Sequence, residues 1–233
     1  MRIYASTYDD IWNAAGLSKE KHPVISVVGA GGKSSLIQHF SKCLNQRKIR
    51  HFIVTTTHMW PIEPGEYGSQ PGILNEDGKV MPPTEAEWEQ IFQSEVPVLI
   101  EADGSKRRPC KAPEAWEPVL REETTHVFAV LGASCLGQKI KNICHRPNRV
   151  ADVLECSEEH VLNTSDLAKL FRSDHGLYKN VSDKIKYYCV LNQVDDDETY
   201  ERVHLMKKDM REEYIQDVFF TRLNDRDKHG DTL

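Results

Sequence analysis

The chain lacks the features that mark membrane and secreted proteins. No apolar run approaches the roughly 18 residues that a membrane-spanning helix needs, and residues 1–10 contain no apolar signal core. The six cysteines are dispersed and include no Cys-x-x-Cys pair. This spacing disfavours a metal or disulfide framework and favours reduced, buried thiols. We therefore expect a cytoplasmic protein with no membrane partner.

The chain also has no excess of basic residues. Its 30 Lys and Arg are outnumbered by 36 Asp and Glu, which gives a net charge of −6. Binding to a nucleic-acid backbone relies on many contacts between cations and phosphates, so we expect no nucleic-acid partner. With 39% hydrophobic residues in 233, the chain can bury one large core. We expect a single domain, residues 1–233, with its core at about 23–222.

Strand and helix patterns alternate along most of the chain. An apolar, β-branched run at 24–28 precedes a glycine-rich break, a helical pattern at 33–46 and a second strand at 51–56. Such a βαβ unit requires parallel strands. Further strands are expected at 96–101, 126–131, 187–191 and 218–220. This alternation predicts an α/β fold with a three-layer, mostly parallel open sheet like that of P-loop NTPases.

One segment interrupts the alternation. Residues 61–83 hold five of the eleven prolines, and residues 73–80 have the pattern of a small hairpin. We expect this segment to leave the sheet near the mouth of the site. Helices are expected at 84–93 behind a Thr84/Glu87 capping box, at 114–121, as a pair within 149–172, and as one long helix at 198–214.

The strongest functional motif joins the first strand to the first helix. Its sequence is Gly29-Ala30-Gly31-Gly32-Lys33-Ser34-Ser35. Glycines let backbone amides approach a phosphate, and the helix dipole favours negative charge at the same place. Lys33 would neutralise terminal phosphates, and Ser34 would bind Mg²⁺. Val27 stands where the standard G-x-x-x-x-G-K-[ST] pattern has its first glycine, so a loop that serves only strand–helix packing is the structural alternative.

The third strand ends in Glu101-Ala102-Asp103-Gly104, which contains two acidic residues. In phosphate-loop proteins the carboxylate that organises Mg²⁺ lies at the end of a buried strand. We assign Asp103 to the metal, through water, and Glu101 to orienting water or holding Lys33. These three residues form the predicted catalytic set. The structural alternative is that Asp103-Gly104 is simply a turn.

Cations and threonines are expected at the same edge of the sheet. Four cations fall within six residues: Lys106, Arg107, Arg108 and Lys111. They would stabilise charge during phosphoryl transfer, grip an anionic partner, or form a solvated loop. Thr56 and Thr57 leave the second strand where open α/β sheets bind ligands, although threonine also favours strands in general.

The segment after the fifth strand, Asn192-Gln193-Val194-Asp195, bears on the choice of base. It resembles the Asn-Lys-x-Asp motif of GTP-binding proteins, in which the Asp accepts hydrogens from guanine, although Gln193 replaces the Lys. We therefore include Asn192 and Asp195 among the predicted nucleotide contacts. The acidic run 195–198 also suits the start of a helix, so the choice between ATP and GTP stays open.

Taken together, these segments resemble the YqeC family of selenium-dependent molybdenum hydroxylase accessory proteins. The matching segments are residues 27–36, 55–59, 101–113, 117–118 and 145–147. The resemblance implies a phosphate-loop protein that works beside a nucleotidyltransferase-like partner, the molybdenum cofactor and a molybdenum hydroxylase. The expected function is Mg²⁺-dependent binding and hydrolysis of ATP or GTP in maturing these enzymes or their cofactor. The alternatives are transfer of a phosphoryl or nucleotidyl group to the cofactor, and non-catalytic binding of a nucleotide or of molybdopterin phosphate.

Overall fold

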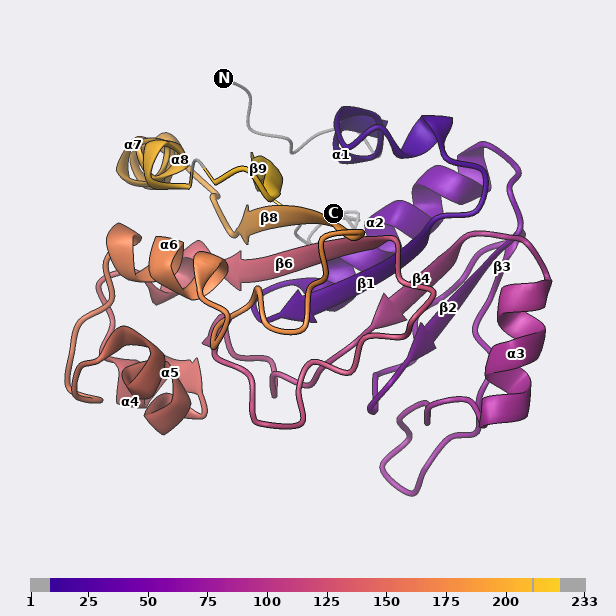
Figure 1. Cartoon of the computed structure of the whole chain (residues 1–233), viewed down its shortest axis with the longest axis horizontal. Helices are drawn as coiled ribbons and strands as arrows, with labels where there is room; N and C mark the ends of the chain where they lie inside the picture. The colour runs from indigo at the N-terminus through magenta and orange to yellow at the C-terminus, as the bar shows by residue number, and fades with distance from the viewer. Residues whose placement is uncertain (1–8, 211, 223–233) are drawn as a thin grey trace, which may run out of the picture.

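A seven-stranded, all-parallel sheet forms the centre of the computed structural model, which describes residues 9–210 and 212–222 (Figure 1). Its strand order is β3-β2-β4-β1-β6-β8-β9. The strands are β1 (Val24–Gly29), β2 (His51–Thr55), β3 (Gly68–Ser69), β4 (Val98–Glu101), β6 (His126–Gly132), β8 (Lys186–Asn192) and β9 (Ile215–Phe220). The predicted α/β open sheet is confirmed, and it is parallel throughout.

Helices cover both faces of the sheet, which gives three layers. One face packs against α1 (Asp9–Ala14) and α2 (Lys33–Gln46). The 3-10 turn Leu17–Lys19 packs on the same face. The other face packs against α3 (Glu85–Gln93), α4 (Ile140–Ile143), α5 (Pro147–Leu154), α6 (Thr164–Arg172), α7 (Asp197–Val203) and α8 (Met206–Asp209). A second, two-stranded parallel sheet pairs β5 (Cys110–Lys111) with β7 (Cys144–His145).

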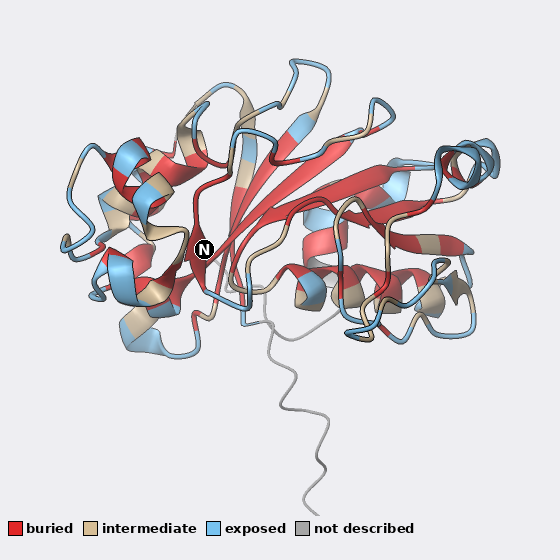
Figure 2. Ribbon diagram, turned by 90° about the horizontal axis from the view of Figure 1, so that it is seen from below, coloured by how far each residue is buried: buried red, intermediate tan, exposed pale blue. Residues whose placement is uncertain are grey.

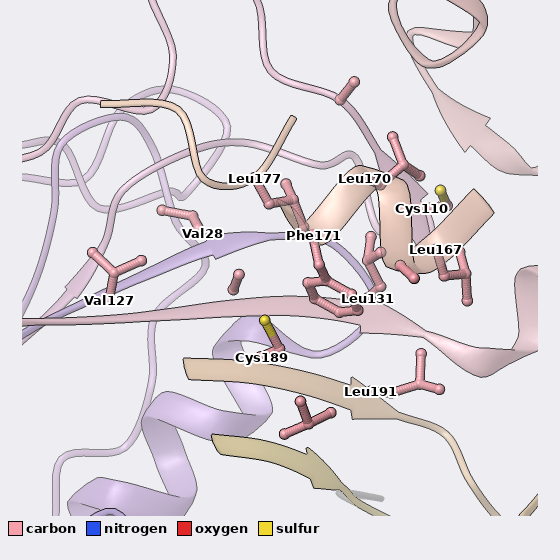
Figure 3. Close-up of a cluster of buried hydrophobic side chains, with 14 of the residues drawn as sticks. Val28, Cys110, Val127, Leu131, Leu167, Leu170, Phe171, Leu177, Cys189 and Leu191 are labelled. Carbon is pink, nitrogen blue, oxygen red and sulfur yellow. The ribbon is translucent and has the colours of Figure 1, made fainter. Parts of the chain in front are cut away.

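The central strands read as unbroken apolar runs because both of their faces are buried. In β6, Phe128 and Val130 face the α2 layer, whereas Val127 and Leu131 face the opposite core. Figure 2 shows the strands as a continuous buried band between the helices. On the far side, Phe171 of α6 packs among the core residues around Leu131 (Figure 3).

The first βαβ unit matches its prediction closely. Helix α2 spans residues 33–46 and buries Leu36, Ile37, Phe40, Cys43 and Leu44, the residues at helical spacing. Its Phe40 ring meets Phe128 edge-on, with ring centroids 5.0 Å apart. Helix α3 carries the predicted capping box between Thr84 and Glu87. All six cysteines are free thiols, and all except the half-buried Cys156 are buried.

The segment 61–83 is tied to the sheet at two places. Strand β3 pairs in parallel with β2 at the edge of the sheet. The expected small hairpin is confirmed by the antiparallel bridge between Leu74 and Val80, and Val80 also bridges Met59. This second bridge brings the hairpin back to the chain that leaves β2, so the segment 61–83 lies beside the end of that strand.

Two predicted helices are wrong. Residues 114–121 form no helix, and only residues 115 and 116 are in a turn. Pro118 lacks an amide donor and disfavours the helical conformation at Glu117, the residue before it. The long helix at 198–214 is instead two short helices, α7 and α8. Val203, Met206 and Met210 are buried on one side across the break, so the apolar spacing gave no sign of it.

Two findings concern the extent of the chain. The single-domain assignment for residues 1–233 stays a prediction, because residues 1–8, 211 and 223–233 lie outside the part described here. Among the helices within the described ranges, none has the length and apolar character needed to cross a membrane.

Candidate functional site

A pocket of about 740 Å³ opens at the carboxyl edge of the sheet, beside the glycine-rich loop. Open parallel sheets commonly bind ligands at this edge. The lining residues are 31–35, Gln38, 57–63, Lys79, Glu101, 104–107, Glu117 and 192–193. Segments far apart in the sequence meet here because they follow parallel strands of the same sheet: β1, β2, β4 and β8.

Glycine is required at two positions of the loop by the backbone that surrounds it. Gly31 has φ +75°, and a Cβ there would lie 2.4 Å from the amide nitrogen of Gly132 and 2.8 Å from the carbonyl oxygen of Pro109. Gly29 has φ +96°, and its Cβ would lie 2.2 Å from the carbonyl oxygen of Val130. Tight packing, the structural alternative, therefore explains Gly29 and Gly31. It does not explain the pocket that opens beyond them.

The amides available to an anion are those of the first turn of α2. The amides of Gly29, Ala30 and Gly31 already donate, respectively, to Asp103, to the carbonyl of Val130 (2.8 Å) and to the carbonyl of Arg108 (3.0 Å). The first amides of any helix have no acceptor within it, and no side chain caps α2. Residues 33–35 line the pocket. The anion-binding position is therefore the start of α2, which the rest of the loop holds in place.

Lys33 lies at this position with its ammonium group anchored. It is 4% exposed. Its Nζ donates to the carbonyl oxygen of Gly29 at 2.8 Å and lies 3.3 Å from Oδ1 of Asp103. A lysine held between a carbonyl and a carboxylate beside a pocket is oriented before a ligand arrives.

Asp103 is fully buried, and its two oxygens are already engaged. It accepts hydrogen bonds from the amide of Gly29 at 3.1 and 3.0 Å, and Lys111 lies 2.9 Å from its Oδ2. It does not line the pocket. The assignment of Mg²⁺ to Asp103 stays a prediction, and the geometry gives this carboxylate a bracing role between the loop and two lysines.

Of the two acidic residues predicted at the end of the third strand, Glu101 lines the pocket. Its Oε2 accepts a hydrogen bond from the hydroxyl of Ser34 at 2.8 Å, and both residues line the pocket. Burial raises the pKa of Glu101, against the opposing effects of the Lys33 charge and the Ser34 hydrogen bond. A buried carboxylate with a shifted pKa beside a candidate anion site is typical of a functional position.

The Ser34–Glu101 pair also fits Mg²⁺. This ion prefers hard oxygen ligands and is usually bound by one or two carboxylates together with phosphate oxygens and water. Within residues 9–210 and 212–222, no group of three or more His, Cys, Asp or Glu could hold a metal by itself. A magnesium ion at this position would therefore depend on oxygens of the bound ligand.

The threonines at the end of β2 form hydrogen bonds with the backbone of Glu101. The Thr55 hydroxyl and the Thr56 amide both donate to the Glu101 carbonyl, at 2.9 and 3.1 Å. Thr57 lines the pocket, whereas Thr56 does not. The Thr56 hydroxyl is buried and has no hydrogen-bond partner. Of the two predicted threonines, only Thr57 is placed to meet a ligand in this arrangement.

The four predicted cations take three different positions. Lys106 and Arg107 line the pocket. Arg108 is turned away and donates to the carbonyl of Asn142 at 2.6 Å. Lys111 is fully buried and joins Asp103 to Glu117. Only the first two remain available for a ligand in the pocket.

Glu117 completes this buried charge network. Burial alone would raise its pKa, but hydrogen bonds and charge from Arg146 and Lys111 outweigh burial and hold the pKa at about 2. The network therefore links the loop after β4 to Arg146, the residue that precedes α5. Sequence patterns did not reveal it, since the partners come from separate segments and only the fold brings them together.

Asn192 braces the loop from the β8 side. It is 2% exposed, its Nδ2 donates to the Gly31 carbonyl at 2.8 Å, and its Oδ1 accepts from Thr221 at 3.0 Å. Asp195 is exposed and does not line the pocket. Asp196 caps α7 by accepting from the Thr199 amide at 2.7 Å, so the acidic run does begin a helix. Guanine recognition by Asp195 stays a prediction.

The sequence analysis missed one wall of the pocket. This wall includes Trp60, from the segment that follows β2, and Lys79, from the small hairpin. Trp60 is 46% exposed. The available signal was a large aromatic residue beside a proline-rich excursion that was expected to lie near the site.

Comparison with known proteins identifies relatives of this chain. The family model described as "YqeC protein" matches residues 25–78 and 69–148. A protein of Escherichia coli (strain K12), described as "Uncharacterized protein YqeC", is 33% identical over 205 residues, which cover 76% of this chain and 78% of that protein. No solved structure matches the chain significantly.

Proposed function

The chain belongs to the YqeC family, and from this premise and the pocket geometry we propose that it binds ATP or GTP with Mg²⁺ and hydrolyses the nucleotide. The observation that carries the proposal is the hydrogen bond of 2.8 Å between Ser34 and Glu101 at the start of α2. It places a hydroxyl, a carboxylate and the first-turn amides of a helix around one pocket. This combination suits a phosphate chain that carries a metal ion.

Each residue has a defined task in this proposal. The amides of residues 33–35 bind phosphate oxygens, and the Lys33 ammonium neutralises the β- and γ-phosphates. Ser34 and Glu101 would hold Mg²⁺, which when bound draws negative charge away from the phosphates. Asp103 keeps Lys33 and the loop in position. Because these groups are already oriented, little reorganisation is needed when charge develops on the transferred phosphoryl group.

Calorimetric titration tests the binding step. We expect wild-type protein to bind ATP or GTP in the presence of Mg²⁺ and Lys33→Ala to lose at least tenfold in affinity, because a direct charge–phosphate contact disappears. Ser34→Ala removes one hydroxyl together with its hydrogen bond to Glu101, and it should weaken binding in Mg²⁺ more than in EDTA. Lys48→Ala, an exposed lysine just beyond α2, is the matched control. Wild-type affinity in both site variants would overturn the proposal even if Lys33→Ala folds poorly.

A second candidate function is transfer of a phosphoryl or nucleotidyl group to an acceptor. It is favoured by the size of the pocket, about 740 Å³, and by Lys106 and Arg107 beyond the phosphate position. Phosphate release without any acceptor would support hydrolysis. Turnover that appears only after an acceptor is added would support transfer, and tight binding with no turnover would support a non-catalytic role.

The resemblance noted in the sequence suggests where this activity operates. We propose that the nucleotide cycle serves the maturation of selenium-dependent molybdenum hydroxylases or of their cofactor. Co-purification of the tagged chain with a molybdenum hydroxylase, stronger with nucleotide than without, is the expected result. If the same amount of molybdenum hydroxylase co-purifies with and without nucleotide, the nucleotide site has no part in that interaction.

A further inference from the structure

The strand order divides the pocket into two ends. The glycine-rich loop follows β1, which lies between β4 on one side and β6 and β8 on the other. Asn192 and Gln193 line the end beyond β8, whereas the segments after β2 and β4 line the opposite end. A phosphate chain at the start of α2 therefore occupies the middle and leaves both ends free for other parts of a ligand.

The end beside β2 and β4 presents an aromatic ring to the pocket. Trp60 is 46% exposed, although its neighbours Met59 and Ile62 are only 1% and 9% exposed. Met59 is fixed by paired backbone hydrogen bonds with Val80, of 3.2 and 2.8 Å. These contacts hold the chain on both sides of Trp60, so the fold itself keeps the Trp60 side chain exposed.

Two cations flank the same ring. The guanidinium carbon of Arg107 lies 5.2 Å from the centroid of the Trp60 ring, and Nζ of Lys79 lies 5.5 Å from it. Both cations line the pocket, as does the neighbouring Lys106. The acidic residue Glu63 also lines it. Arg107 has φ +58° and Lys106 has φ +47°. Two consecutive residues that are not glycine rarely adopt this conformation, and here it places a positively charged turn beside the tryptophan.

We propose that Trp60, Arg107 and Lys79 form a subsite for the flat heteroaromatic ring of a phosphorylated ligand. The inference rests on the phosphate site proposed above, and it specifies the chemical class of the group that is attached to the bound phosphate. Trp60 is 46% exposed. An indole ring stacks on heteroaromatic rings, and the cations over it favour an anionic ring or its phosphate. The ring belongs either to the base of the bound nucleotide or to a second, phosphorylated heterocycle.

Titrations with three kinds of probe test the subsite. The probes are inorganic tripolyphosphate, ATP or GTP, and flavin mononucleotide added after a non-hydrolysable ATP analogue, all with Mg²⁺. Trp60→Ala should leave the tripolyphosphate affinity unchanged and weaken a ring-bearing probe by roughly tenfold, the scale of one lost stacking contact. Trp60→Phe should recover most of that loss. The matched control is Trp116→Ala, since Trp116 is 68% exposed and contacts Arg146 but does not line the pocket.

The two sources of the ring give different results. Weaker binding of ATP or GTP to Trp60→Ala assigns the ring to the nucleotide base. An unchanged nucleotide affinity with weaker flavin mononucleotide binding assigns it to a second ligand. Arg107→Ala should weaken flavin mononucleotide more than uncharged riboflavin. Equal affinities of wild type, Trp60→Ala and Trp116→Ala for every probe would overturn the subsite, as would an equal loss of tripolyphosphate and ring-bearing probes.

Failure of the phosphate site itself has its own outcome. If wild-type protein binds neither tripolyphosphate nor nucleotide, the proposed function fails. Binding of flavin mononucleotide that still depends on Trp60 would then support the subsite alone. Quenching of tryptophan fluorescence gives a second readout, because Trp12 and Trp88 are each 2% exposed. Ligand-induced quenching should persist in Trp116→Phe and disappear in Trp60→Phe.

Discussion

Glu101 shows how one residue can lower stability while serving a site. Its carboxylate is buried, and burial raises its pKa, so the ionised form costs the folded state free energy at neutral pH. The sign follows from linkage. Because the folded-state pKa lies above the unfolded value, this cost is greatest above the folded pKa and is relieved as the pH falls through it.

Glu101→Gln should therefore stabilise the empty protein and weaken Mg²⁺-dependent nucleotide binding. We expect a gain on the order of 1 kcal/mol in the free energy of unfolding at pH 7, which corresponds to a rise of about 2–4 °C in Tm for a chain of this size. Nucleotide affinity in Mg²⁺ should fall by about tenfold or more, because glutamine offers the metal no charge. Thermal unfolding and calorimetry measure the two effects.

The matched control for this prediction is Glu63→Gln. Glu63 also lines the pocket, but its side chain is exposed. Its substitution should leave Tm within about 1 °C, since exposed charges contribute little to stability. If Glu101→Gln destabilises the protein and leaves nucleotide binding intact, the carboxylate is structural and the proposed metal position is wrong.

At the scale of elements, the junction of β1 and α2 depends on Gly31. Both Gly31 and Gly78 have φ +75°, but a Cβ at Gly31 would meet the backbone of Gly132 and Pro109, whereas a Cβ at Gly78 would meet no atom within 4 Å. Gly78→Ala should cost only the left-handed conformation, about 1 kcal/mol. Gly31→Ala pays the same cost and must also displace neighbouring backbone, so it should cost more than 2 kcal/mol and reduce nucleotide affinity.

Urea unfolding and nucleotide titration of both variants measure this difference. Because the two glycines share the same φ, the cost of the left-handed backbone is the same in both variants. Any additional loss of stability in Gly31→Ala therefore reports the close packing of the loop. Equal stability of the two variants would mean that the loop can move away from Gly132 without loss. A Gly31→Ala protein that keeps full affinity would separate the loop geometry from phosphate binding.

The same elements explain what the sequence could predict. The β1–α2 unit was predictable because its signals are local: a β-branched run, a glycine break and helical spacing. Strands β3, β5 and β7 have two residues each and form only through partners distant in the chain. In the site, Lys33, Ser34 and Glu101 lie together as their positions suggested. The engagement of Asp103 by Lys111 was not predictable, since only the folded turn after β4 returns that lysine to the loop.

At the scale of the whole molecule, one buried chain of charges crosses from α2 to the start of α5. Lys33 lies 3.3 Å from Asp103, Asp103 lies 2.9 Å from Lys111, and Lys111 lies 2.8 Å from Glu117. Glu117 also pairs with Arg146, immediately before α5. Because Asp103, Lys111 and Glu117 each have charged partners on two sides, the charges of this network compensate one another, and the loop position is coupled to the helical layer on the other face of the sheet.

This network makes acid stability depend on Glu117. Its pKa is about 2 in the folded protein, where Arg146 and Lys111 outweigh the effect of burial, against an ordinary value of 4.5. A lowered folded-state pKa contributes stability that is fully present above 4.5 and is lost as the pH falls towards 2. Glu117→Gln should therefore lose about 2 kcal/mol at pH 7, and its deficit relative to wild type should shrink between pH 4.5 and pH 2.

Urea unfolding of wild type and Glu117→Gln at a series of pH values measures that deficit, and groups common to both proteins cancel in the difference. Glu85→Gln is the control, because Glu85 pairs with Arg121 at the surface with its side chain 76% exposed, and exposed ion pairs contribute little to stability. A Glu117→Gln deficit that stays constant down to pH 2 would mean that lost packing, and not lost charge, destabilises the variant. A deficit that closes with acid would instead show that the charge of Glu117, paired with Lys111 and Arg146, stabilises the fold.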